Sequence, residues 1–276
     1  YFDQSSNSQG TDLRRETVLT LEELGIPVES SHHEAAPSQH EIDLRHTDAL
    51  TMADSVMTYK LVVKEIAMQH GFYASFMPKP VAEITGNGMH THMSLFEGDK
   101  NVFYEEHDEA HLSQTARHFS AGLMKHAREI TLVTNQWVNS YKRLVPSYEA
   151  PTYVTWSDVN RSDLIRIPSF MPGREMSRRI EYRAPDPACN PYLAFSVMLA
   201  AGLEGIKNKY KLPEASGRNV NDMSSEERYS RGIEPLPSNL YEAIQITEGS
   251  ELVRKALGDN VFQSFIENKK IEWNRF

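Results

Sequence analysis

Three short segments of the chain carry, at every second position, side chains that can bind metal ions or anions. These side chains are His90, His92 and Ser94 in the first segment, Arg179, Glu181 and Arg183 in the second, and His32 and Glu34 in the third. Successive side chains of a strand point to opposite faces, so each set shares one face if its segment is extended. The spacing therefore predicts three strands that each present polar ligands on one side.

Carboxylates and imidazoles together are suitable ligands for Mg²⁺ or Mn²⁺. Glu34 and Glu41 lie seven positions apart across a predicted turn, and His90 and Glu181 belong to two of the alternating segments. Alternating polar residues also mark the solvent face of an antiparallel sheet, and that simpler interpretation is favoured for each segment taken alone. The combination of the three segments favours a divalent cation site.

Five arginines fall within a short interval of an acidic chain, namely Arg143, Arg161, Arg166, Arg179 and Arg183. Guanidinium groups pair with phosphate and carboxylate through two parallel hydrogen bonds, and they stabilise the charge that develops in phosphoryl transfer. The alternative is a set of surface salt bridges with the many Asp and Glu residues. The sequence contains no glycine-rich phosphate loop, so any nucleotide must be held by metal ions and arginines.

The composition excludes several classes of protein. The 276 residues are 39% apolar and 24% charged, which is too apolar for a disordered chain. With 29 basic and 38 acidic residues the net charge is −9, which disfavours a nucleic-acid partner. The longest apolar stretch, residues 194–203, is too short to span a membrane. The single cysteine, Cys189, has no partner for an intrachain disulfide, which favours a cytoplasmic location.

Hydrophobic periodicity predicts the helices and strands that must position these residues. Helices are predicted over residues 11–24, 48–71, 112–132 and 190–210. Strands are predicted over residues 26–34, 72–77, 89–96, 153–156 and 178–183. Residues 213–237 are predicted to form a loop, short helices are expected from residue 238 onward, and Met57, Met68 and Met198 are expected in the core. The interleaving of strands with long helices predicts an α+β fold.

Several motifs resemble those of type I glutamine synthetases, in register over nearly the whole chain. They are residues 32–34 (HHE), 39–41 (QHE), 77–80 (MPKP), 88–95 (GMHTHMSL), 139–146 (NSYKRLVP), 148–151 (YEAP), 160–162 (NRS), 166–168 (RIP), 179–187 (RIEYRAPDP) and 190–194 (NPYLA). The resemblance implies that residues 1–276 are the catalytic domain of that family, with a curved antiparallel sheet backed by long helices.

The resemblance also implies residue roles. Two divalent ions, Mg²⁺ or Mn²⁺, lie between ATP and glutamate in that family; Glu34 and Glu41 match ligands of the first ion, and His90 and Glu181 match ligands of the second. The positions that match contacts to glutamate are Gly86, Arg143, Glu149, Arg161 and Arg183. The positions that match the nucleotide site are Glu29, His92, Ser94, Arg161, Arg166 and Arg179.

The implied reaction is the ATP-dependent ligation of ammonia to glutamate, which gives glutamine through γ-glutamyl phosphate. Glu149 matches the loop residue that closes over this intermediate and helps to deprotonate ammonium, and Arg143 and Arg161 complete the implied catalytic set. Metal ions and arginines disperse phosphoryl charge, and a closing loop keeps water from the acyl phosphate.

The resemblance implies a larger assembly. Members of the family form dodecamers of two hexameric rings, and their small N-terminal β-grasp domain and first catalytic strand have no counterpart in this sequence. The chain is therefore expected to be the catalytic part of a longer cytoplasmic protein and to be inactive alone. Thr85 stands where the family usually has an asparagine that contacts glutamate.

Two alternatives to glutamine synthesis remain open at this point. A related γ-glutamyl ligase uses a polyamine or another organic amine and keeps the same phosphoryl machinery; the carboxylate of Glu149 favours ammonia, because it suits a small cation. A non-catalytic member of the family is expected to lose metal ligands or phosphate-binding arginines, whereas the ligand positions that this chain covers are intact.

Overall fold

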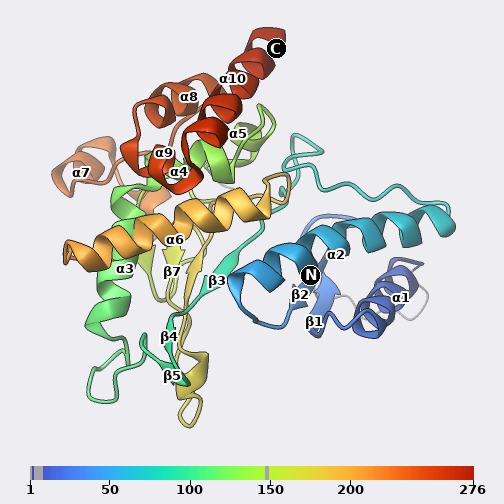
Figure 1. The fold of residues 1–276 in the computed structure, drawn as a ribbon, viewed down its shortest axis with the longest axis horizontal. Coiled ribbons are helices and arrows are strands. Elements are labelled where there is room, and N and C mark those ends of the chain that lie inside the picture. The colour runs from blue at the N-terminus through green and yellow to red at the C-terminus, as the bar shows by residue number, and fades with distance from the viewer. Residues whose placement is uncertain (1, 3–8, 147–148) are drawn as a thin grey trace. The chain divides into compact units, whose positions relative to one another are not determined.

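The computed structural model describes Phe2, residues 9–146 and residues 149–276. The chain divides into two compact units, residues 1–86 and residues 87–276. We refer to them as unit 1 and unit 2 and describe each by itself (Figure 1).

Unit 1 contains two helices and a β-hairpin. Its elements are α1 (Gln9–Glu23), β1 (Val28–His33), β2 (His40–Leu44) and α2 (Ala49–Gln69). The two strands pair antiparallel, and a small core forms between them and the helices from Leu21, Ile26, Val28, Val62 and Ile66. Asp48, the first residue of the predicted helix, lies just before α2 and caps it by accepting hydrogen bonds from the backbone N–H groups of Leu50 and Thr51.

The buried face of α2 differs from the sequence prediction. Met57 and Met68 are 47% and 64% exposed, so their predicted place in the core is wrong, whereas Met198 is fully buried as expected. The residues of α2 that are buried instead are Ala53, Val56, Val62, Ile66 and Ala67. Apolar residues surround this helix on several sides, so periodicity alone does not select the face that packs.

Unit 2 is built around a four-stranded sheet. Its strands follow the order β3 (Thr91–Met93), β8 (Ile180–Tyr182), β7 (Ile165–Arg166) and β6 (Trp156–Ser157). The pairs β3–β8 and β8–β7 are antiparallel, as expected, but β6 and β7 run parallel. This pairing brings segments 90 residues apart in sequence into hydrogen-bonded contact.

Figure 1 shows α6 (Pro191–Lys207) lying across the sheet of unit 2 with α3 (Gln114–Lys125) beside it, and residues of both helices and of α4 (Ala127–Thr134) share one hydrophobic core with the strands. Ile180 and Tyr182 of β8 are fully buried in one hydrophobic core with Phe119 of α3 and Val197 of α6. The packed face of β8 is therefore fixed, which leaves Glu181 on the opposite face.

The remaining elements of unit 2 lie in its loops and its C-terminal part. They are β4 (Phe96–Glu97), β5 (Lys100–Asn101), α5 (Ser140–Arg143), η1 (Glu175–Ser177), η2 (Val220–Asp222), α7 (Ser225–Ser230), α8 (Leu240–Glu248), α9 (Glu251–Leu257) and α10 (Asp259–Arg275). The predicted helix start at Asn190 is confirmed, since its side chain accepts hydrogen bonds from the backbone N–H groups of Tyr192 and Leu193 and Pro191 opens the helix.

Five other predicted elements need correction. The predicted helix at 112–132 is two helices, because the backbone of His126 leaves the helical conformation between α3 and α4. The predicted loop at 213–237 contains α7, whose start is capped by the Ser224 side chain. In the part of the chain that the structure describes, residues 72–77 form no strand. The strand predicted over residues 153–156 is limited to Trp156–Ser157. Only short helices were predicted after residue 238, whereas α10 has 17 residues.

The close crossing of α3 and α6 depends on glycines. A Cβ atom built on Gly122 would lie 2.2 Å from the carbonyl oxygen of Ala201 and 2.8 Å from the backbone of Gly205. We expect Gly122→Ala to lower the free energy of unfolding by about 3 kcal/mol, because backbone atoms cannot move aside as a side chain can. Denaturant unfolding measures the loss. Gly249→Ala is the control, since its Cβ would meet only the Ile246 oxygen at 3.8 Å, and equal stability of both variants would contradict the prediction.

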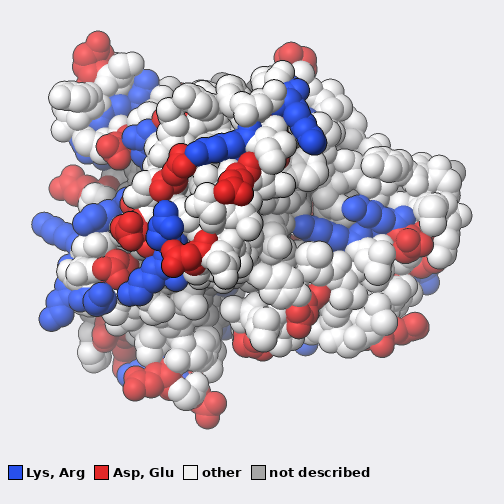
Figure 2. Space-filling view, turned by 45° about the horizontal axis from the view of Figure 1, so that its top comes forward, with Lys and Arg blue, Asp and Glu red and all other residues white. Residues whose placement is uncertain are grey.

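Among the described residues, no helix combines the length and the apolar character needed to cross a membrane. On the face drawn in Figure 2, basic and acidic side chains of the described residues are intermixed rather than gathered into one large basic area.

Candidate active site

The hairpin of unit 1 carries the first cluster of predicted ligands. His32 of β1 lies directly opposite Glu41 of β2 in the antiparallel register, so their side chains leave the same face. The Nε2 atom of His32 is 3.8 Å from a carboxylate oxygen of Glu41 and 3.8 Å from a carboxylate oxygen of Glu34. The predicted common face of His32 and Glu34 is thus confirmed, and Glu34 and Glu41 both approach one imidazole.

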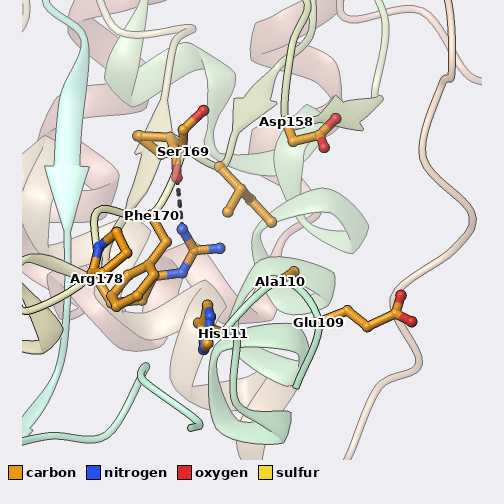
Figure 3. A pocket seen from close by; sticks show the side chains of 10 residues that line it. Glu109, Ala110, His111, Asp158, Ser169, Phe170 and Arg178 are labelled. Atoms are coloured by element: carbon orange, nitrogen blue, oxygen red, sulfur yellow. Dashed lines mark hydrogen bonds between the residues drawn. The ribbon is translucent and has the colours of Figure 1, made fainter. Parts of the chain in front are cut away.

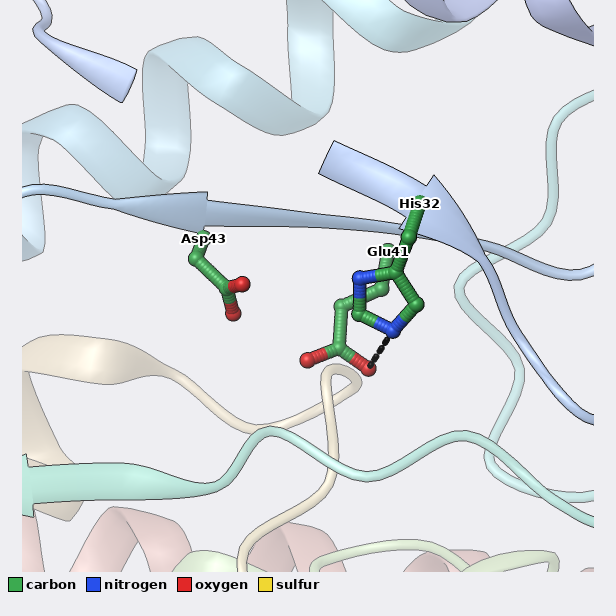
Figure 4. A group of neighbouring side chains, drawn as sticks. All are labelled: His32, Glu41 and Asp43. Carbon is green, nitrogen blue, oxygen red and sulfur yellow. Dashed lines mark ion pairs between the residues drawn. The ribbon is translucent and has the colours of Figure 1, made fainter. Parts of the chain in front are cut away.

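Asp43 joins this cluster, and sequence reasoning missed it. Ligand atoms of His32, Glu41 and Asp43 lie within 4.8 Å of one another, and Figure 4 shows the three side chains on the same side of the hairpin. The Ser30 hydroxyl donates a hydrogen bond to Asp43 and holds it in place. The signal was available, because Asp43 follows Glu41 by two positions on the same strand. Carboxylates and one imidazole within this distance form a donor set that suits Mg²⁺ or Mn²⁺.

Glu41 has a raised affinity for a proton in this cluster. Burial, followed by the nearby carboxylates of Asp43 and Glu34, raises the pKa of Glu41 to about 8. Such a group is protonated at neutral pH unless a cation replaces the proton, so the cluster is poised to exchange a proton for a positive ion.

Two further predicted residues lie in unit 1. The side-chain amide of Gln39, at the end of the hairpin turn, donates a hydrogen bond of 3.0 Å to the carbonyl of Gly86 and so ties the glutamate-contact position to the hairpin. Glu29 lies exposed on β1. It is separate from the contacts that join His32, Glu34, Glu41 and Asp43.

Glu181 is the centre of the second cluster, in unit 2. The registers of the sheet place His92 of β3 opposite it on one side and Arg166 of β7 on the other. Its carboxylate accepts hydrogen bonds from Arg166 and, at 2.6 Å, from Nη1 of Arg183, and it lies 3.4 Å from Nδ1 of His90. The predicted alternation of β8 is therefore confirmed, and Glu181 is 98% buried among cationic partners.

The arginines keep Glu181 ionised. Burial alone raises the pKa of this carboxyl, but the positive charges of Arg183 and Arg166 and the hydrogen bond from Arg166 outweigh it, so its pKa lies below the usual value. A buried, ionised carboxylate retains free lone pairs for a cation.

His90 is held as a neutral imidazole. Partial burial of its side chain, which remains 31% exposed, together with the positive charges of Arg183 and Arg143, lowers the pKa of His90 below its usual value. Neutral imidazole is the form that binds metal ions. Beyond His90, Nε of Arg179 donates a hydrogen bond of 2.9 Å to Nδ1 of His92, which joins two predicted nucleotide-site residues.

Arg143 is buried behind this cluster. Its guanidinium donates hydrogen bonds to the carbonyls of Ala184 at 2.7 Å and Arg183 at 3.1 Å. A Cβ atom on Gly88 would lie 2.7 Å from Nη2 of Arg143 and 2.6 Å from Nε2 of His90, so a larger residue here would displace these two side chains. Burial lowers the pKa of Arg143 to about 10, and it remains charged at neutral pH.

The other predicted residues of unit 2 lie in loops. The backbone carbonyl of Arg161 accepts a hydrogen bond of 3.0 Å from Nε of Arg183, while Ser94 follows β3. Glu149 is exposed and has a left-handed backbone, with φ of 55°. Burial lowers the pKa of Arg183, but the carboxylates of Glu181 and, more weakly, Glu149 raise it, so Glu149 lies within electrostatic reach of the cluster. Tyr148, the other half of the predicted loop motif, lies outside the described residues.

The side chains of the two clusters are typical of enzymes that bind phosphates together with metal ions. Such enzymes use carboxylates and imidazoles as ligands of divalent cations, and they use arginines to bind the phosphates. The chain belongs to the glutamine synthetase family: the family described as "Glutamine synthetase, catalytic domain" matches residues 1–276.

Known proteins resemble the chain over its whole length. The glutamine synthetase of Mycolicibacterium smegmatis is 52% identical over 276 residues, which is 100% of this chain and 62% of that protein. The glutamine synthetase of Staphylococcus aureus is 50% identical over the same span, 61% of its own length. The chain thus spans about three fifths of these relatives.

Solved structures share the fold. The structure described as a GmaS/ADP complex has a TM-score of 0.88 and 35% identity and covers 99% of this chain, which corresponds to 62% of that chain. Apo GmaS without ligand gives a TM-score of 0.84 and 36% identity over the same shares. These matches confirm the predicted glutamine synthetase catalytic-domain fold.

Proposed function

We propose that the protein to which this chain belongs ligates ammonia to glutamate at the expense of ATP and releases glutamine, ADP and phosphate. The observation that carries the proposal is Glu181, a buried carboxylate held between Arg166 and Arg183 and next to His90. Membership of the family and relatives named glutamine synthetase at 50–52% identity support it. The GmaS/ADP complex supports an adenine nucleotide as a ligand of this fold.

We propose that two or more divalent ions, Mg²⁺ or Mn²⁺, bind to the two clusters. In unit 1 the ligands are Glu34 and Glu41, with His32 and Asp43 close enough to take part. In unit 2 they are His90 and Glu181. Bound there, the ions supply charge neutralisation of the phosphates and Lewis-acid polarisation of the transferred group.

The arginines and the loop carboxylate complete the proposed chemistry. The γ-carboxylate of glutamate attacks the γ-phosphorus of ATP, ADP leaves, and Arg161 and Arg166 stabilise the charge on the phosphoryl oxygens. Arg179, His92, Ser94 and Glu29 position the nucleotide. Arg183, with Arg143 and the Gly86 backbone, holds glutamate.

The second step is the attack of ammonia on the acyl carbon of γ-glutamyl phosphate. A new C–N bond forms, the C–O bond to phosphate breaks, and inorganic phosphate leaves. Glu149 accepts the proton that ammonium must lose before its nitrogen can attack. Its exposed position in a loop suits a group that closes over the site only when the intermediate is present.

The proposed protein context follows the family. We propose that units 1 and 2 together act as one catalytic domain, that the protein assembles into a homo-oligomer, a dodecamer of two hexameric rings, and that it acts in the cytoplasm without a nucleic-acid or membrane partner. Size-exclusion chromatography with light scattering tests the assembly, and a monomer at micromolar concentration contradicts it.

An assay of phosphate release from ATP, run on the protein as it occurs naturally with Mg²⁺ and glutamate, tests the activity. Ammonium is compared with methylamine, putrescine and aniline. Release that rises with ammonium and is not raised by the other amines confirms glutamine synthesis. Release that requires an organic amine, or none with any amine from a folded protein, refutes it.

The pKa of Glu41 gives a prediction for the metal site of unit 1. Because Glu41 is protonated below about pH 8, Mn²⁺ must displace its proton, and we expect the affinity for Mn²⁺ to rise from pH 6.5 to pH 8.5. Isothermal titration calorimetry in two buffers of different ionisation enthalpy counts the protons released. Glu41→Gln removes the release, and Glu65→Gln on the exposed face of α2 is the control. An affinity that does not change with pH contradicts the assignment.

A further inference from the structure

Asn101, the last residue of the β4–β5 hairpin in unit 2, forms hydrogen bonds in two directions. The residue is only 3% exposed, and its side-chain nitrogen donates to the backbone carbonyls of Glu175, Met176 and Arg178 at 3.2, 3.1 and 2.8 Å. Its side-chain oxygen accepts a hydrogen bond of 3.0 Å from the backbone N–H of Phe103, which belongs to the hydrophobic core. One side chain thus joins the core of unit 2 to a turn that begins 74 residues further along the chain.

The partners of Asn101 fix the orientation of its amide group. Carbonyl groups only accept hydrogen bonds and the backbone N–H of Phe103 only donates one, so the nitrogen and the oxygen of the amide cannot be exchanged. The two hydrogens of the nitrogen serve three carbonyls, so one hydrogen is shared. Because all these contacts depend on a single buried side chain, its removal deprives the turn of a support that water does not readily replace.

Arg178 holds the same turn from the other side. Its side chain is almost fully buried, and Nη1 donates a hydrogen bond of 2.6 Å to the carbonyl of Pro168, drawn as the dashed line in Figure 3. Within the turn, the backbone N–H of Arg178 donates to the carbonyl of Glu175 at 3.2 Å. Residues 175–178 are therefore fixed by two buried side chains, and Asn101 supplies the one that contacts most of the turn.

Arg179, a residue proposed above for the nucleotide site, follows this turn directly. Its Nη1 donates a hydrogen bond of 3.2 Å to the carbonyl of Ser177, and its Nε donates one of 2.9 Å to Nδ1 of His92. Both contacts are exposed to solvent, and exposed contacts of charged side chains stabilise one conformation only weakly. The Ser177 carbonyl lies between two carbonyls that Asn101 holds, so the direction of the group that Arg179 contacts depends on the buried amide.

We infer that Asn101 is a positioning residue of the proposed nucleotide site and that it acts through Arg179. By holding the turn, it keeps Arg179 against His92 before the nucleotide arrives, which lowers the entropic cost of binding. The inference rests on the proposed function, in which Arg179 and His92 position ATP. A residue that served stability alone would affect ATP and glutamate alike, whereas the contacts of Asn101 lead to the nucleotide residues.

Titration of the protein as it occurs naturally with a fluorescent ATP analogue, in the presence of Mn²⁺, tests the inference. We expect Asn101→Ala to weaken binding of the analogue about tenfold or more, since a displacement of about 1 Å can cost a factor of about 100. The KM for ATP should rise by a similar factor, while kcat and the KM for glutamate stay unchanged. Asn260→Ala, at an exposed position of α10, is the matched control.

Two further variants separate positioning from stability. Gly122→Ala destabilises unit 2 at the crossing of α3 and α6, and while it is folded it should bind the analogue as the unaltered protein does. Asn101→Asp keeps an oxygen for the N–H of Phe103 but turns a second oxygen toward the three carbonyls, which repel it. It should weaken the analogue as Asn101→Ala does, and it replaces that variant if Asn101→Ala does not fold. Thermal unfolding verifies folding at the assay temperature.

A double-mutant cycle with Arg179→Gln tests the route. If Asn101 acts through Arg179, adding Asn101→Ala to Arg179→Gln should weaken the analogue by less than about twofold, because coupled residues are not additive. Unchanged binding by folded Asn101→Ala, a full tenfold loss in the Arg179→Gln background, or an equal loss of affinity for ATP and glutamate overturns the inference. The titration needs no turnover, so it decides the role of Asn101 even if the protein makes no glutamine, whereas an unaltered protein that binds no nucleotide refutes both proposals.

Discussion

Glu149→Ala is expected to lower ammonium-dependent turnover by about 100-fold or more while γ-glutamyl phosphate still forms. The carboxylate is proposed to remove the proton from ammonium, and a positioned general base typically contributes a factor of about 10²–10⁴. The first step uses the arginines and metal ligands, which this substitution leaves intact. Rapid-quench measurement of acyl phosphate, beside the steady-state release of glutamine, separates the two steps.

The structure makes Glu149→Ala a clean experiment. The side chain is exposed, so its removal leaves no buried cavity, and alanine shares with glutamate the modest cost of a left-handed backbone. Glu149→Gln tests the charge alone, and Glu226→Ala on the exposed face of α7 is the matched control. An equal loss of both steps would show that Glu149 acts in phosphoryl transfer instead.

Glu181→Gln should weaken metal-dependent nucleotide binding by more than about 100-fold. The loss of a partner that only orients a metal ligand costs about 10–100-fold in metal affinity, and Glu181 is proposed as a ligand itself. The substitution also leaves Arg166 and Arg183 facing a neutral amide, so their mutual repulsion is no longer offset. Titration with a fluorescent ATP analogue, with and without Mn²⁺, measures the effect.

The choice of glutamine keeps the shape of the buried side chain, whereas Glu181→Ala adds a cavity at a position that is 98% buried. Thermal unfolding of each variant shows whether the sheet survives. Glu97→Gln, on an exposed strand of the same unit, is the control. Nucleotide binding that is independent of metal, or unaffected by Glu181→Gln, would refute the assignment of this cluster.

Local alternation predicted which side chains share a face but not which strands meet. The period of two around Glu181 correctly separated it from the buried Ile180 and Tyr182. The register that places His92 and Arg166 on either side of it depends on pairing between distant segments, which no local pattern contains. The sequence therefore predicted which residues form the cluster, largely through the family motifs, but not how those residues are arranged in space.

The predicted buried face of α2 was wrong because several faces of this helix are equally apolar, and tertiary packing decides which of them is buried. Helix α2 has apolar residues around much of its surface, and its contacts with α1 and the hairpin, rather than its periodicity, bury Val62 and Ile66 instead of Met57 and Met68. Asp43 was overlooked for a different reason. Its place two positions after Glu41 puts both carboxylates on one face of the strand, but only the hairpin register, which brings His32 across from Glu41, shows that the three form one group of ligands.

The buried guanidinium of Arg143 has a practical consequence for protein engineering. It donates hydrogen bonds to the backbone carbonyls of Arg183 and Ala184, and so it holds in place the segment that carries Arg183. A variant that loses Arg143 is expected to displace Arg183 as well as to remove the contact proposed between Arg143 and glutamate, so a poorer response to glutamate would report both changes. Attempts to change the specificity for the acid substrate should therefore vary the residues around Arg183 and keep the hydrogen bond from Arg143 to the Arg183 carbonyl.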